Sequence, residues 1–346
     1  MIRDDLEFAL SVAKVNPTMT FQLLPYICLV ALETANYLRI HVQNEHLSSI
    51  RAKAKFLDDT KIDIEETLDL LKQVREDHSS HFTELHKWWQ FAARARQPDI
   101  GEFRYNGIFL GTTHLFNYYI SSSSSAATIN SLKNGKMRNI GYQAGQVLGK
   151  IVDSGKIYID RSVTSVKVYD ESAMKGVDYV SRKYFAAKFD GRFQVDVIQY
   201  LQMLLSMLNA VFYVIGESLV NSFSLFKVRY VTLYHVLNSV RKLEAYFRIN
   251  NLFCAKSEFV FREISMGETP KKMRANKKFR NILVHYRLSD SIVSNGSSEN
   301  AYGLVEAFFR DSNFGELDAG VKAKIAQSIS LLNDWMVGSL HHENHT

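Results

Sequence analysis

Apolar residues recur every three or four positions along most of this chain of 346 residues, which is the spacing of amphipathic α-helices. In the N-terminal part, this spacing predicts helices over residues 2–15, 21–57 and 62–97, each followed by a stretch that contains Asp, Asn or Pro. In the C-terminal part, it predicts helices over residues 197–216, 221–247, 253–264, 271–289 and 321–337. We therefore expect a mainly α fold.

The middle of the chain has a different pattern. Residues 121–125 are five consecutive serines, which is typical of a loop or linker. Residues 156–161 and 165–169 are rich in β-forming side chains, and they predict a small β-hairpin near 156–169. The expected organisation is a helical N-terminal region of unknown role over 1–120, a linker with this hairpin over 121–191 and a helical bundle over 192–340.

Residues 197–216 contain no charged side chain over 20 positions, which is long enough to span a bilayer. Polar residues nevertheless recur along one side of this helix, at Gln199, Gln202, Ser206 and Asn209. We therefore predict a buried helix of a bundle and no membrane association. The two cysteines, Cys28 and Cys254, cannot form a disulfide framework, and no apolar signal core follows Met1, so we expect a cytoplasmic location.

The most informative stretch is residues 271–289, which contain no Gly or Pro and can form one helix. Four apolar residues share one side of this helix: Phe279, Ile282, Leu283 and Tyr286. The opposite side carries Asn281 and His285, one turn apart. Their neighbours on that side are Arg280, Val284 and Leu288. The helix therefore has one face for its own core and a second face that requires a partner.

An Arg and a His on one basic helix can supply the groups that a ribonuclease without a metal ion requires. His285 can transfer a proton near neutral pH. Arg280 can bind a phosphate through two donors and stabilise the charge that develops on it. Asn281 can orient either the phosphate or His285. These three residues are the candidate catalytic residues.

The charge distribution agrees with an acidic partner such as RNA. The formal net charge is +6, made of −3 over residues 1–120 and +9 over the remainder. Six basic residues surround the candidate catalytic residues and are the predicted RNA contacts: Lys271, Lys272, Arg274, Lys277, Lys278 and Arg287.

The segment Arg280-Asn281-Ile282-Leu283-Val284-His285 resembles the motif of HEPN domains (higher eukaryotes and prokaryotes nucleotide-binding), in which four to six residues separate an Arg from a His and a polar residue often follows the Arg. The resemblance covers the C-terminal half only. It implies a HEPN-like helical bundle and a homodimer in which two such helices build one composite site for RNA cleavage. Val284 and Leu288 would then line the dimer interface. A toxin or phage-defence effector, with an antitoxin or regulatory partner, is the implied role.

Two further functions fit the same residues. One is a HEPN-like module that binds RNA or a nucleotide without cleaving it, and the other is a helical protein-interaction protein. Other Arg and His pairs have similar spacing, at Arg39 and His46, Arg75 and His81, and Arg229 and His235, but none has Asn after the Arg. Asp77, His78 and His81 have helical spacing but no zinc motif, so we expect neither a metal ion nor a cofactor.

Overall fold

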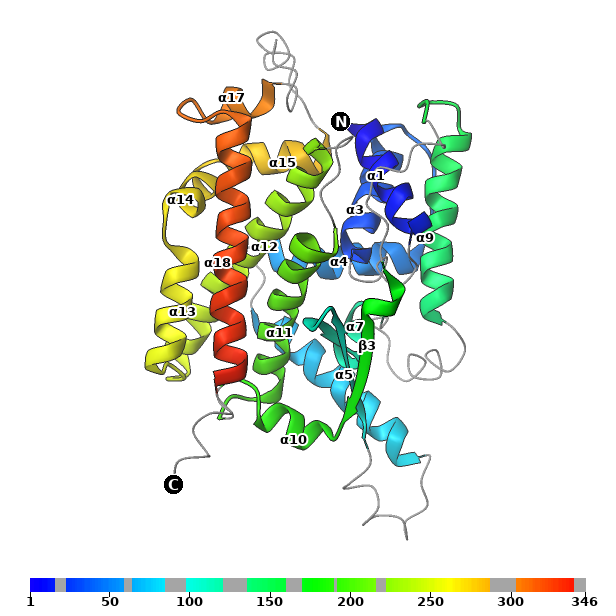
Figure 1. Cartoon of the computed structure of the whole chain (residues 1–346). Helices are drawn as coiled ribbons and strands as arrows, with labels where there is room; N and C mark the ends of the chain where they lie inside the picture. Colours follow the sequence, from blue (N-terminus) through cyan, green and yellow to red (C-terminus); the bar gives the residue numbers. More distant parts are fainter. Residues whose placement is uncertain are drawn as a thin grey trace.

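The computed structural model describes residues 1–15, 23–58, 64–84, 98–120, 136–159, 170–189, 192–215, 222–286 and 303–338. These residues form a mainly α fold with one small antiparallel sheet, which confirms the predicted fold class. Figure 1 shows long helices side by side in the C-terminal half, next to a group of N-terminal helices that includes α1, α3, α4 and α9.

The N-terminal helices are α1 (Ile2–Val15), α3 (Leu24–Tyr37), α4 (Glu45–Asp58) and α5 (Ile64–Glu84). The first matches its prediction, but the single helix expected over 21–57 is wrong. The chain leaves the helix after Tyr37, because Arg39 adopts a left-handed conformation with φ 53°. The side chain of Asn44 then accepts a hydrogen bond of 3.0 Å from the Leu47 amide and so starts α4. The predicted helix at 62–97 is α5 as far as Glu84, and the rest lies outside the described residues.

The sheet consists of β1 (Ile100–Tyr105), β2 (Ile108–Thr112) and β3 (Met174–Tyr179), in the order β2-β1-β3. Strands β1 and β2 form a hairpin around Asn106 and Gly107, which both have positive φ values, 48° and 80°. Asn-Gly is the preferred pair for such a two-residue turn. Of the hairpin predicted near 156–169, residues 156–159 form no strand, and 160–169 lie outside the described residues.

Further helical elements precede the C-terminal half. They are α7 (Thr113–Ile120), α9 (Lys136–Asp153), a 3₁₀ turn η2 (Glu171–Ala173) and α10 (Ser181–Ala186). Glu102 of the central strand β1 connects the sheet to α10, because its carboxylate accepts a hydrogen bond of 2.6 Å from the Tyr184 hydroxyl. The side chain of Lys188 lies 3.4 Å from the same carboxylate.

The C-terminal half is a bundle built around α11 (Val195–Asn209), α12 (Ser222–Ile249), α13 (Ala255–Ser265) and α18 (Phe314–Gly338). A π-helical turn, η3 (Ala210–Val214), extends α11. Three short helices complete this half: α14 (Glu268–Ala275), α15 (Lys277–His285) and α17 (Leu304–Phe308). Figure 1 shows α15 running across the end of α12, between α18 and the N-terminal helices.

The polar side of α11 faces the sheet. Asn209 Nδ2 donates a hydrogen bond of 2.7 Å to the Phe109 carbonyl, and the Ser206 hydroxyl donates to the Leu110 carbonyl. Gln202 Nε2 donates to the Tyr184 hydroxyl at 2.9 Å. The segment Val195–Val214 is long and apolar enough to cross a membrane, yet 83% of its apolar 18-residue window is buried inside the protein. The prediction of a buried bundle helix is therefore confirmed.

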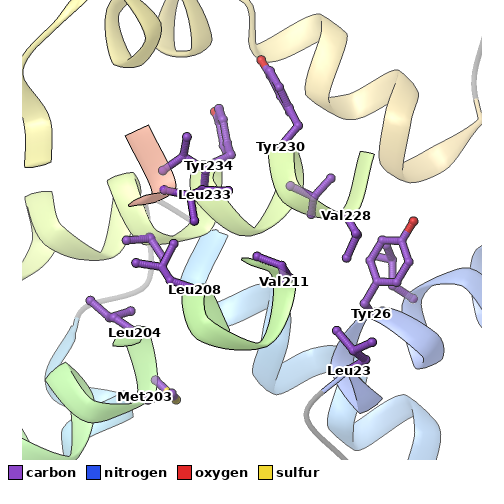
Figure 2. Close-up of a cluster of buried hydrophobic side chains, with 14 of the residues drawn as sticks. Leu23, Tyr26, Met203, Leu204, Leu208, Val211, Val228, Tyr230, Leu233 and Tyr234 are labelled. Atoms are coloured by element: carbon purple, nitrogen blue, oxygen red, sulfur yellow. The ribbon is translucent and has the colours of Figure 1, made fainter. Parts of the chain in front are cut away.

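The two halves of the chain share one hydrophobic core. A single cluster of buried apolar residues extends from Leu6 to Met336. Figure 2 shows Leu23 and Tyr26, at the start of α3, on the same side of the cluster as Val211 of η3 and Val228 of α12. The predicted N-terminal region is thus joined to the bundle by buried contacts, instead of forming a core of its own.

Candidate active site at the Arg280–His285 helix

The helix that carries the motif is shorter than predicted. Residues 268–285 form two helices, α14 and α15, which are separated at Asn276 (φ −113°, ψ 52°). Helix α15 ends at Tyr286, which has a left-handed conformation with φ 54° and whose amide donates to the Ile282 carbonyl at 3.0 Å. Arg287 and Leu288 lie outside the described residues.

The predicted apolar side of the helix is confirmed, since Phe279, Ile282, Leu283 and Tyr286 are all buried. The opposite side is also largely covered, because α15 contacts both α12 and α3. Val284 has no exposed surface in the single chain, and it belongs to the chain's own core. The role of Val284 and Leu288 at a dimer interface stays a prediction. Helix α3, which the sequence did not connect with the motif, packs against this side of α15.

His285 is paired with a carboxylate from the N-terminal half. Its Nδ1 atom lies 2.9 Å from Glu33 Oε2, and the other oxygen of Glu33 accepts a hydrogen bond of 3.1 Å from Arg51 Nη2. A carboxylate in an ion pair only accepts, so Nδ1 of His285 carries the proton and Nε2 is left for another partner. The His285 side chain is 34% exposed. It is the most accessible member of this group.

Two opposing effects set the ionisation of Glu33. Burial alone would raise the pKa of its carboxyl group, but the hydrogen bonds and charges of His285 and Arg51 outweigh burial and lower the pKa. Glu33 is therefore ionised at neutral pH, and its negative charge favours a proton on the side of the imidazole that faces it.

Arg280 is buried and 6% exposed. Its Nη1 atom donates a hydrogen bond of 3.0 Å to Asn281 Oδ1, and its guanidinium carbon lies 5.8 Å from the centre of the Tyr234 ring. Burial and, to a smaller extent, the charge of Arg51 lower the pKa of Arg280 to about 10, although the charge of Glu33 offsets part of their effect. Arg280 is thus still protonated at neutral pH, and Asn281 contacts Arg280 directly.

Most of the predicted RNA contacts lie on the surface. Lys271, Arg274, Lys277 and Lys278 are exposed along α14 and α15. Lys272 is half-buried, and its ammonium group donates a hydrogen bond of 2.6 Å to the Ser312 hydroxyl. Arg274 also holds the backbone of the preceding helix, through a hydrogen bond of 3.0 Å to the Ser265 carbonyl. We call the four exposed residues the basic edge.

A second, fully buried polar group fixes the end of α15. Asp5 of α1 forms an ion pair with Lys227 of α12, and it accepts hydrogen bonds from the Tyr286 hydroxyl at 2.9 Å and the Ser224 hydroxyl at 3.0 Å. Burial lowers the pKa of Lys227, and the negative charge of Asp5 acts in the opposite direction. Because Tyr286 follows His285, this group holds the imidazole close to α1 and α3.

Sequence reasoning did not identify Glu33, Arg51 or Asp5. A signal was present for Glu33, which is the only charged residue in the otherwise apolar helix α3. A charge in a helix that is buried on most sides requires a partner. The sequence could not supply the identity of that partner, since it is 252 residues away.

The remaining candidates lie elsewhere. His78 is buried, and its Nε2 atom lies 2.8 Å from the Asp99 carbonyl, while the side chain of His81 is outside the described residues. Within the part of the chain that the structure describes, no three His, Cys, Asp or Glu side chains gather as a metal site. Arg229 and His235 are both buried.

Comparisons with models of protein families, with curated proteins and with solved structures find no match for this chain. The HEPN resemblance therefore depends on the motif and its surroundings alone, and it stays a prediction.

Proposed function

We propose that this protein is an endoribonuclease that needs no metal ion, with His285 as the residue that transfers a proton. The observation that carries the proposal is the contact of 2.9 Å between His285 Nδ1 and Glu33. A carboxylate that fixes the tautomer of a partly exposed histidine is a common arrangement for general acid–base catalysis.

The reaction follows from the chemistry of RNA. His285 Nε2 removes the proton of a 2′-hydroxyl, and the 2′-oxygen attacks the neighbouring phosphorus. The bond from phosphorus to the 5′-oxygen breaks, and this oxygen takes a proton from solvent. No external nucleophile is required, because the ribose already holds the 2′-oxygen beside the phosphorus. The products are a 2′,3′-cyclic phosphate and a 5′-hydroxyl.

Positive charge near His285 supports the same proposal. Arg51 and Arg280 lie close enough to each other for the charge of one to lower the pKa of the other. Both place positive charge next to the Glu33–His285 pair, where a phosphorane would develop negative charge. The basic edge on α14 and α15 would hold the RNA backbone.

This version of the site requires one chain only. Glu33 and Arg51 come from the N-terminal half of the same molecule. A homodimer, an antitoxin or regulatory partner, a role in toxicity or phage defence and a cytoplasmic location remain predictions that this proposal does not depend on.

A defined oligonucleotide tests the proposal. The substrate is a DNA strand with a single ribonucleotide, and its control has deoxyribose at that position. We expect cleavage in EDTA, only after the ribonucleotide, with a cyclic phosphate on the 5′ fragment. Cleavage of the all-DNA control, or a requirement for Mg²⁺, would exclude this mechanism.

RNA binding without cleavage is the second candidate, and the burial of Arg280 favours it. A guanidinium that is 6% exposed and bonded to Asn281 has little surface to offer a phosphate. In this case the basic edge would bind RNA in a salt-sensitive manner, and the oligonucleotide would remain intact.

A further inference from the structure

Tyr37 ends helix α3, one helical turn after Glu33, so the two side chains project from the same side of that helix. Glu33 contacts His285, and the Tyr37 ring contacts the ring of the next residue, Tyr286. The centres of the two tyrosine rings are 6.3 Å apart, and their planes meet at 71°. These two successive contacts between α3 and α15 place the Tyr37 ring next to the candidate active site.

The Tyr37 ring is open to solvent and has a fixed neighbour on one side. Tyr37 is 56% exposed, whereas Tyr286 is 2% exposed and donates its hydroxyl to Asp5 at 2.9 Å. The edge-to-face contact between the two rings is a favourable arrangement of aromatic side chains. Tyrosine has only two side-chain torsions, so a flat ligand can stack on it at a small cost in conformational entropy.

Exposure alone does not single out Tyr37, because isolated apolar side chains are common on protein surfaces. Tyr142 and Tyr158 are more exposed, at 64% and 77%. Tyr37 differs in its position and in the positive charge beside it. The ammonium group of Lys156, which is exposed, donates a hydrogen bond of 2.7 Å to the carbonyl of Leu38, the residue after Tyr37. An exposed ring with a cation beside it suits a single-stranded nucleic acid, whose bases stack on the ring while its phosphates meet the charge.

We propose that Tyr37 stacks on a base of single-stranded RNA, at one of the two nucleotides that flank the phosphate next to His285. This inference rests on the proposed function in one respect, that RNA binds at His285, and it holds whether or not the RNA is then cleaved. Every base has a flat face, so stacking accepts any sequence, with a modest preference for purines because their faces are larger.

The test compares three fluorescent hexamers by anisotropy: an adenylate RNA, a uridylate RNA and a ribose-phosphate strand that lacks all bases. The protein is the full chain with His285→Ala, so that no cleavage disturbs the measurement. Because each hexamer has the same sugar or base at every position, the comparison does not depend on the register of binding. We expect the adenylate hexamer to bind most tightly and the strand without bases most weakly.

Tyr37→Ala, added to this protein, should weaken binding of the adenylate hexamer by about 5- to 100-fold, the range found for loss of a stacking ring. It should leave the affinity for the strand without bases unchanged. Tyr37→Phe keeps the ring and should bind the adenylate hexamer as tightly as the protein with Tyr37. An unchanged affinity in Tyr37→Ala, or an equal loss with the strand without bases, would overturn the proposal. So would a loss in Tyr37→Phe as large as in Tyr37→Ala, since the hydroxyl would then be the contact.

Tyr179→Ala is the matched control. Tyr179 is 37% exposed, and its ring lies 5.3 Å from that of Tyr184, which is buried and donates its hydroxyl to Glu102. The same arrangement of an open ring on a fixed one therefore occurs at the end of β3, which Figure 1 shows next to α10 and away from α15. Tyr179→Ala should leave all three affinities unchanged, and a loss equal to that of Tyr37→Ala would place the stacked base elsewhere.

The protein without the His285→Ala change separates this proposal from the ribonuclease activity. If it leaves the adenylate hexamer intact in EDTA while Tyr37→Ala still weakens binding, the stacking proposal stands and the ribonuclease proposal fails. If it cleaves the hexamer and Tyr37→Ala alters neither affinity nor the protein concentration that gives half the maximal rate, the ribonuclease proposal stands and the stacking proposal fails.

Discussion

The imidazole of His285 and the carboxylate of Glu33 are 2.9 Å apart, although 252 residues separate them along the chain. Glu33 lies on an apolar helix of the N-terminal half, and its second oxygen is bonded to Arg51. Three side chains from three helices therefore form one chain of contacts. Since the outermost of them, His285, is the most exposed, the arrangement presents an oriented imidazole to the solvent.

The first prediction concerns the tautomer of His285. Because Glu33 accepts from Nδ1, neutral His285 should carry its proton on Nδ1, with Nε2 unprotonated. The nitrogen chemical shifts of the ring, measured by two-dimensional NMR above pH 8, report this directly. In the Glu33→Ala variant, the proton should move to Nε2, which is the usual tautomer of free histidine. A wild-type protein with the proton on Nε2 would contradict the contact.

The second prediction concerns stability at acid pH. The pKa of Glu33 is lowered in the folded protein, so its contribution to stability is present above the unfolded pKa, near 4.5, and is lost as the pH falls through the lower folded value. At pH 7 the Glu33→Gln variant should be less stable than wild type by about 1–2 kcal/mol, since a charged hydrogen-bond partner is lost. This difference should narrow below pH 4.5. Urea unfolding of both proteins at several pH values measures this difference in unfolding free energy. A difference that grows as the pH falls would contradict the prediction.

The third prediction concerns the buried pair of Asp5 and Lys227. Lys227→Met should cost about 3–5 kcal/mol, because Asp5 is left as an uncompensated buried charge. The double variant Asp5→Leu with Lys227→Met should recover part of the loss, since two apolar residues can replace a buried ion pair. Urea unfolding of the two single variants and the double variant gives the coupling energy.

The exposed pair of Glu244 and Arg248, 3.2 Å apart, is the control for this cycle. Its removal should change stability by about 0.5 kcal/mol or less, because solvent screens the two charges. If the double variant at Asp5 and Lys227 is no more stable than Lys227→Met, the buried charge is not the cause of the loss.

The sequence predicted most of the helices because amphipathic spacing is a local property. The prediction failed where a single residue ends a helix, as at Arg39, because a non-glycine residue there adopts a positive φ. The position of the hairpin could have been predicted, since Asn106-Gly107 is a strong turn signal between two short β-forming segments. The β-rich composition at 156–169 led us to expect a hairpin there, and most of that segment lies outside the described residues.

For the candidate site, the sequence supplied one helix and not its surroundings. Arg280, Asn281 and His285 could be selected by their spacing and by the basic residues before them. Burial could not be judged in the same way, because whether Val284 faces solvent depends on where α3 lies. Contacts such as that between His285 and Glu33 depend on the whole fold, and spacing along the chain contains no information about them.

The fourth prediction concerns the rate of RNA cleavage, measured in single-turnover experiments with EDTA. His285→Ala should lower the rate by about 10²–10⁴, because it removes the proton transfer. Arg280→Ala should cost about 10²–10³, because a fixed positive charge near the phosphate is lost. Asn281→Ala should be milder, since Asn281 acts through its contact with Arg280. Arg39→Ala and His46→Ala, which alter another pair of similar spacing, should leave the rate unchanged. If either variant lost as much activity as His285→Ala, the site could not be assigned to Arg280 and His285.

The last prediction concerns the basic edge, and it holds whether the protein cleaves RNA or only binds it. Replacement of Lys271, Arg274, Lys277 and Lys278 by alanine removes four exposed positive charges from α14 and α15. Binding to single-stranded RNA releases about 0.7 counterions for each phosphate that is neutralised. If all four residues contact phosphates, the negative slope of log affinity against log salt concentration should become shallower by about 3 in the variant.

Fluorescence anisotropy between 50 and 300 mM salt, with the His285→Ala protein to prevent cleavage, gives this slope. Arg182 and Lys183 are the matched control, because both are exposed on α10, which Figure 1 shows at the end of the molecule opposite α15. Their replacement by alanine should leave the slope unchanged. Since nonspecific attraction would respond to any lost charge, equal effects of the two sets would show that the basic edge is not an RNA-binding surface.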